Sequence, residues 1–108
     1  MTTSEQFKSE MGKCRDVFSK KLYDYGASWR ILRPSSVTDQ ILIKAKRIRS
    51  LETKGIAMVD EGIYPEFQAI VNYGIVGLIQ LEKGYSDVVD MSADEAMALY
   101  DRHAEEAL

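Results

Sequence analysis

The sequence contains few of the residues that identify disulfide-bonded, metal-binding or secreted proteins. It has one cysteine, Cys14, among 108 residues, so no disulfide can form within the chain, and a reducing cytoplasm is the simplest setting. The one histidine, His103, has no cysteine or second histidine nearby, which argues against a transition-metal site and against Ser-His-Asp chemistry. The opening residues, MTTSEQFK, lack the charged and then apolar pattern of a signal peptide. Together these absences indicate a cytoplasmic location.

Strand patterns, phosphate-binding loops and a basic charge balance are missing as well. No stretch alternates apolar and polar residues, no Asn-Gly hairpin turn occurs, and neither GxxxxGKS/T nor GxGxxG is present. The formal net charge is −3, whereas proteins that bind bulk duplex DNA are usually basic, so we do not expect such DNA as a partner. The longest apolar run is far shorter than the roughly 20 residues that a membrane span requires, so no membrane partner is expected either.

What is present is a globular composition with helical periodicity. Hydrophobic residues make up 45% and charged residues 29%, which favours one soluble domain over residues 1–108. Apolar residues at steps of three and four predict an all-α bundle of about four helices. Capping residues and glycines place these helices at about 3–25, 36–54, 65–83 and 92–108. The residues expected to cap the helices are Thr3 (with Gln6), Ser36 and Ser92 (with Glu95).

Two residues outside the candidate site have simple structural interpretations. Cys14 lies on the apolar face of the first predicted helix, so we expect it to pack there as a small hydrophobic side chain. His103 is expected to lie near a helix end, where the helix dipole favours it. The last helical pattern reaches Leu108 without a cap or a breaker. We therefore expect the chain to stop at a domain boundary, with 92–108 beginning a second repeat or packing on another subunit.

The stretch over 65–83 is apolar on nearly every face, and we expect it to form a buried central helix. Glu66 complements the positive end of its dipole. Gly74 and Gly77 are expected to let a neighbouring helix approach closely. Asn72 is an amide in the middle of the helix and must find a hydrogen-bond partner if it is buried. With Glu66 at its start and Asn72 in its middle, this helix is predicted to form the floor of a polar pocket.

The connector before the second helix combines aromatic and charged residues. Asp24, Tyr25, Trp29, Arg30 and Arg33 all lie within thirteen residues of one another. Loops that carry aromatic and guanidinium groups are common binding surfaces, so one interpretation is a ligand-binding loop. The alternative is structural: Trp29 fills the core, as tryptophan often does, and the two arginines are solvated.

The second predicted helix carries a basic segment. Lys44 and Arg47 are three residues apart and share a helix face, and Lys46 and Arg49 form a similar pair. One interpretation is a set of cations that face phosphate groups. The other is an ordinary solvated helix surface, which is the usual role of such charges.

Three stretches resemble the nucleotide-modification-associated domain family of bacteria and phages. They are KLYDYGASWR from Lys21, RPSSVTDQILIKAKRIRSLE from Arg33, and DEGIYPEFQAIVNYGIVGLIQLE from Asp60. The family is all-helical and is similar to MazG-like nucleoside triphosphate pyrophosphatases, so the resemblance implies a MazG-like bundle. The residues that match its DYG motif, its basic helix and its NY pair are expected around one pocket: Lys21 and Asp24, Lys44 and Arg47, and Asn72 and Tyr73.

The resemblance also implies a Mg²⁺ cofactor. All-helical pyrophosphatases hold this ion with carboxylates from facing helices, typically an ExxE on one and an ExxD on the next, and the ion neutralises the substrate phosphates. The candidate metal ligands here are Asp39, Glu61 and Glu66. The acid expected three residues after Glu66 is replaced by Ala69. This departure favours binding or altered chemistry over a standard pyrophosphatase.

The leading hypothesis is a helical domain, assembled as a homo-oligomer, that binds a nucleotide or a related phosphate-bearing small molecule. Lys44 and Arg47 would hold phosphate, and Tyr25 or Trp29 would stack on a base. The full set of predicted ligand-binding residues is Lys21, Asp24, Tyr25, Trp29, Arg30, Arg33, Lys44, Arg47, Asn72 and Tyr73. The alternatives are a Mg²⁺-dependent nucleoside triphosphate pyrophosphohydrolase and a non-catalytic oligomerisation module. Contact with single-stranded nucleic acid through Trp29, Lys46 and Arg49 is disfavoured by the net charge.

Overall fold

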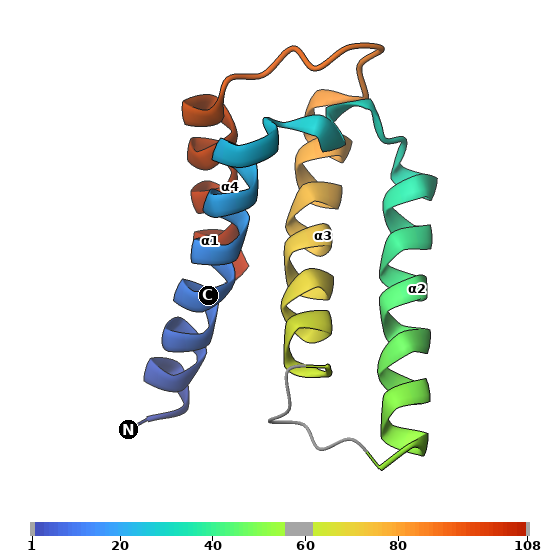
Figure 1. Ribbon diagram of the computed structural model, residues 1–108. Helices are drawn as coiled ribbons and strands as arrows, with labels where there is room; N and C mark the ends of the chain where they lie inside the picture. The colour runs from blue at the N-terminus through green and yellow to red at the C-terminus, as the bar shows by residue number, and fades with distance from the viewer. Residues whose placement is uncertain (1, 56–61, 108) are drawn as a thin grey trace.

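The computed structural model describes residues 2–55 and 62–107 of the protein (Figure 1). Four α-helices and one 3₁₀ helix follow one another along the chain. They are α1 (Thr3–Tyr25), η1 (Ser28–Ile31), α2 (Pro34–Thr53), α3 (Tyr64–Lys83) and α4 (Ala93–Ala107). No strand occurs in the described ranges, so the prediction of an all-α bundle of four helices is confirmed. Within the same residues, no helix combines the length and the apolar character needed to cross a membrane.

Helix α3 lies between the other helices (Figure 1). Helix α2 packs along one of its sides, while α1 and α4 pack against each other and against its other side. The side of α3 that faces α1 and α4 holds the main core, in which the Phe18 ring stacks on the Tyr100 ring at 4.4 Å between centroids. Burying aromatic and branched side chains of this size stabilises a fold by about 1.5–3 kcal/mol each. Helices α1 and α2 both pack against α3 but on different sides of it, and a groove lies between them.

The capping residues at the helix N-termini agree only in part with the predicted ones. The Thr2 hydroxyl, not that of Thr3, accepts from the Glu5 N–H at 3.1 Å, and the Glu5 carboxylate accepts from the Thr2 N–H, which completes a capping box one residue earlier than predicted. Helix α2 begins at Pro34 without a side-chain cap, so the prediction of a Ser36 cap was wrong. The Ser92 cap is confirmed, because its hydroxyl accepts from the Glu95 N–H at 3.1 Å.

The prediction that α3 is buried on every face needs correction. Its exposed residues include Phe67, Leu78 and Leu81, with 40%, 45% and 70% of their surfaces accessible. The reason is that the described residues place neighbours on two sides of α3, so an apolar stripe is left uncovered by them. Gly77 does face a neighbour: a Cβ there would lie 3.5 Å from Cγ1 of Val37 on α2. A Cβ at Gly74 would have no neighbour within 4 Å, so the expected close approach there is absent.

The structure also locates Cys14 and His103, the two residues for which structural roles were predicted. Cys14 is buried, as expected, and this burial raises the pKa of its thiol. His103 lies near the C-terminal end of α4, as expected, and it is buried on the side of α4 that faces α3. Its Nε2 lies 3.7 Å from a Glu82 carboxylate oxygen, and its Nδ1 lies 3.6 Å from Glu106.

Candidate functional site

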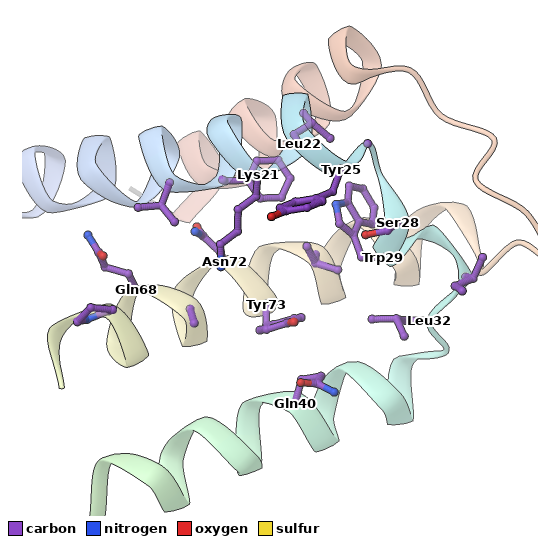
Figure 2. Close-up of a pocket in the computed structure, with 17 residues that line it drawn as sticks. Lys21, Leu22, Tyr25, Ser28, Trp29, Leu32, Gln40, Gln68, Asn72 and Tyr73 are labelled. Carbon is purple, nitrogen blue, oxygen red and sulfur yellow. The ribbon is translucent and has the colours of Figure 1, made fainter. Parts of the chain in front are cut away.

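The groove between α1 and α2 has a volume of about 690 Å³ (Figure 2). Its walls come from the second half of α1, from η1 and from Gln40 of α2, and its floor comes from the part of α3 between Pro65 and Val76. The side chains at its surface are mainly aromatic, aliphatic and amide. The polar and aromatic ones are Lys21, Tyr25, Ser28, Trp29, Gln40, Gln68, Asn72 and Tyr73.

The aromatic wall is built by the end of α1 and by η1. Helix α1 stops at Tyr25 because Gly26 adopts a φ of 72°, which side-chain-bearing residues rarely adopt. The chain then turns into η1, which presents Trp29 beside the exposed Tyr25 (Figure 2). The Trp29 ring also lies 6.1 Å from the Phe18 ring, so it packs on the core and lines the groove at once. The structural interpretation of this tryptophan therefore holds in part, and its role in ligand binding stays a prediction.

A buried amide fixes η1 to the end of α3. Gln80, with only 1% of its surface exposed, has its side-chain nitrogen 2.7 Å from the Leu32 carbonyl oxygen and 2.9 Å from that of Arg30. Its side-chain oxygen accepts from the Arg30 guanidinium. Arg30 also donates to the Gly84 carbonyl at 2.6 Å and to Asp90 at 3.0 Å. This contact holds the pKa of the Asp90 carboxyl below its ordinary value.

Arg30 is therefore engaged in the fold rather than presented to the groove. Its guanidinium is buried against the end of α3 and the segment after it, where it supports η1 from behind. The Arg33 guanidinium lies over the Tyr85 ring, 5.0 Å from its centroid, and does not line the groove. Asp24 is exposed and is not part of the groove lining either. These three predicted ligand residues are not brought together with the others.

Asn72 lies where the groove meets the core. Its side-chain N–H donates to the Cys14 carbonyl on α1 at 3.0 Å, and its side-chain oxygen accepts from the Tyr100 hydroxyl on α4 at 2.8 Å. The partners expected for a buried amide are thus present, and they join α1, α3 and α4. Burial raises the pKa of Tyr100, which keeps this hydroxyl a donor throughout the ordinary pH range.

Glu66 binds the cations that were expected to face phosphate. One of its carboxylate oxygens lies 2.9 Å from Nε of Arg47 and the other lies 3.4 Å from Nζ of Lys44, and only 14% of the Glu66 side chain is exposed. This cluster joins the first turn of α3 to the middle of α2. It borders the groove, because the neighbouring residue Pro65 and the α2 residue Gln40 both line it. An internal carboxylate therefore pairs with both cations and offsets one of their two positive charges.

The predicted magnesium ligands do not form a cluster in the part of the chain that the structure describes. Asp39 is exposed on α2 and does not line the groove, Glu66 is paired with two cations, and Glu61 lies outside the described residues. Within 2–55 and 62–107, no three histidine, cysteine, aspartate or glutamate side chains gather in a way that could hold a metal ion.

The structure thus brings together five of the predicted ligand-binding residues in one groove: Lys21, Tyr25, Trp29, Asn72 and Tyr73. Sequence reasoning missed the amides Gln40 and Gln68, and it also missed Gln80 behind η1. A glutamine on a helix looks like an ordinary surface residue, so nothing in the sequence marks Gln40 or Gln68 as part of a site. Gln80 could have been recognised from the sequence, because it interrupts the apolar pattern of α3 as Asn72 does.

The fold and the groove define a small all-α domain with an aromatic, amide-lined site between two helices. The chain belongs to the family described as nucleotide modification associated domain 1, which matches residues 21–81. No curated protein and no solved structure shows a significant match to the chain. The matched segment contains every groove-lining residue except Val17 and Phe18. The similarity to MazG-like pyrophosphatases stays a prediction.

Proposed function

We propose that the domain binds a nucleoside or nucleotide in the groove between α1 and α2. The observation that carries this proposal is the gathering of Tyr25, Trp29 and Tyr73 with the amides Gln40 and Gln68 around one hollow of about 690 Å³. Ligand sites of small molecules usually have volumes of about 300–1,000 Å³ and combine apolar walls with a few polar groups. Membership of a family associated with nucleotide modification supports the same class of ligand.

The lining residues offer the two kinds of contact that a nucleobase requires. Aromatic rings stack on base faces, and such a contact is worth about 1–3 kcal/mol per base. Each glutamine amide supplies a donor and an acceptor, which suits the hydrogen-bonding edge of a base. Neither Gln40 nor Gln68 has a hydrogen-bond partner within 2–55 and 62–107, so both amides are available to a ligand. In this arrangement Tyr25 and Trp29 contact the base face and the glutamines contact its edge.

The arrangement of the charged residues favours a binding role over Mg²⁺-dependent hydrolysis. A Mg²⁺-dependent pyrophosphohydrolase needs several carboxylates directed at one ion and cations directed at the phosphates. Here the Glu66 carboxylate pairs with Lys44 and Arg47, so neither the acid nor the two cations are directed at a free metal ion or phosphate. We therefore assign the groove a binding role and keep Mg²⁺-dependent hydrolysis as the alternative to be tested.

A thermal-shift panel of nucleosides and nucleotides, with Mg²⁺ or with EDTA, tests the proposal because a ligand that binds the native state raises the melting temperature. We expect at least one compound to stabilise the wild-type protein and to lose this effect in Tyr25→Ala. Tyr23→Ala is the matched control, since Tyr23 is an exposed residue of the same helix that does not line the groove. No stabilisation by any compound, or equal loss in both variants, would contradict the proposal.

The exposed stripe on α3 favours a second role, self-association. Phe67, Leu78 and Leu81 lie on one face of the helix, and that face is opposite to the groove residues Asn72 and Val76 because α-helical positions advance by about 100° per residue. An apolar stripe of this kind is a common docking surface, and we propose a second copy of the chain as its occupant. Light scattering should give a mass above the 12.2 kDa of the monomer, reduced to that value in Leu78→Lys. A monomeric wild type would contradict this role.

A further inference from the structure

The groove carries very little charge for a nucleotide site. Lys21 is the single charged side chain in its lining as far as the structure describes the chain. It forms no ion pair within 2–55 and 62–106, and Figure 2 shows its side chain running from α1 into the groove, toward the side on which Asn72 lies. Its ammonium group is therefore free to meet an anion from a ligand.

The other cations near the groove are already engaged. Lys44 and Arg47 are bound by the Glu66 carboxylate at 3.4 and 2.9 Å. Arg30 is bound by Asp90 and by the end of α3, behind the aromatic wall. A ligand that extends along the groove toward Pro65 approaches the Glu66 carboxylate, which repels a phosphate and already pairs with both cations there. Lys21 is thus the one cation of the groove lining and has no carboxylate partner in the described residues, which favours a ligand with one phosphate group over a ligand with three.

We propose that the ligand of the groove is a nucleoside monophosphate, with its base on Tyr25 and Trp29 and its phosphate on Lys21; this inference rests on the proposed binding function. Tyr25 follows Lys21 by one helical turn on α1, an axial offset of about 5.4–6 Å that leaves room for a sugar between them. A lysine–phosphate contact is a charge-assisted hydrogen bond, which is roughly twice as strong as a neutral one. A triphosphate brings two more phosphates into a groove whose lining carries one cation.

Trp29 is the only tryptophan of the chain and lies in the groove, so its fluorescence reports on occupancy. The titrants are the four common deoxynucleosides and their 5′-mono- and triphosphates, in EDTA and at low salt, where exposed charges are least screened. Excitation at the red edge of the tryptophan band limits absorption by the titrant. We expect the preferred monophosphate to bind about tenfold more tightly than its nucleoside, which corresponds to one charge-assisted contact. We also expect it to bind more tightly than the corresponding triphosphate.

Lys21→Gln keeps the length of the side chain and removes its charge. We expect it to lower the affinity for the monophosphate about tenfold and to lower the affinity for the nucleoside, which has no phosphate, much less. Lys20→Gln is the matched control, because Lys20 is an exposed neighbour on α1 that does not line the groove. Both positions are exposed, so both variants should melt at the wild-type temperature.

The possible results separate this inference from the proposal on which it rests. Nucleoside binding without a preference for the monophosphate, tighter binding of the triphosphate, or an unchanged monophosphate affinity in Lys21→Gln would overturn the inference and leave the binding function standing. No response to any of the titrants, together with no thermal stabilisation, would overturn both.

Discussion

Replacing Gln80 by leucine should destabilise the protein strongly, because this amide holds η1 and the aromatic wall in place. The substitution keeps most of the side-chain volume and removes both polar groups. The carbonyls of Trp29 and Arg30 would each keep a second donor, from the Leu32 and Ser86 N–H groups at 3.0 Å. The main losses therefore fall on the Leu32 carbonyl, whose contact to Gln80 is 2.7 Å, and on the buried Arg30 guanidinium.

The expected magnitude follows from these two losses. A buried carbonyl left without a donor costs about 1–3 kcal/mol, and a lost hydrogen bond to a charged group costs about 1.5–3 kcal/mol. We expect the free energy of unfolding to fall by about 3 kcal/mol or more, which is a large share of the roughly 5–15 kcal/mol of a typical domain. At about 4 °C per kcal/mol for a domain of this size, the melting temperature should fall by roughly 12 °C.

Urea unfolding followed by Trp29 fluorescence and by far-ultraviolet circular dichroism measures this change. Gln68→Leu is the matched control on the same helix, because Gln68 lines the groove without a partner in the described residues, and its stability should change by less than about 0.5 kcal/mol. A loss below about 1 kcal/mol in Gln80→Leu, or equal losses in both variants, would refute the view that this amide anchors η1.

Two further predictions concern the ion pairs around the groove. Glu66→Gln releases Lys44 and Arg47, so it should raise the affinity for nucleoside triphosphates in a fluorescence titration; abolished pyrophosphate release in this variant would instead support Mg²⁺-dependent hydrolysis. The pKa of Asp90 is lowered from its ordinary value of 3.8 by the Arg30 hydrogen bond, so its contribution to stability is present above that value and is lost as the pH falls through the lowered pKa. Asp90→Asn should therefore flatten the acid end of a stability–pH curve, and an unchanged curve would argue against this contact.

Much of the helical framework could be predicted from local patterns, and the errors have local causes. Thr2–Glu5 and Thr3–Gln6 both have the spacing of a capping box, so the pattern alone did not decide between them. Pro34 marks the start of α2, as proline often does in a first helical turn, and the serine two residues later was a weaker signal.

The exposure of α3 could not be predicted from its own sequence. The apolar pattern shows which residues avoid water, but it does not show how many neighbouring helices are available to cover them. With α2 on one side and α1 and α4 on the other, Leu78 and Leu81 stay exposed. A second copy of the chain is the covering element that we propose.

The candidate site was predicted in part. Asn72 and Glu66 were both expected to face one pocket, yet six residues along a helix separate their directions by about 120°. Asn72 therefore meets α1 and α4, and Glu66 meets α2. The different directions of these two side chains could therefore have been predicted from helical geometry alone. The direction of Arg30, by contrast, depends on Gln80 and Asp90, which are 50 and 60 residues away in the chain.

The most direct test of nucleotide binding in the groove is a nuclear magnetic resonance titration of the isotope-labelled protein with deoxynucleoside 5′-monophosphates. The side-chain amide signals of Gln40 and Gln68 and the indole signal of Trp29 should move together and saturate together, while backbone signals around Leu78 stay in place. Signals that do not move at these three groups, or movements confined to other surfaces, would contradict the assignment of the groove as a nucleotide site.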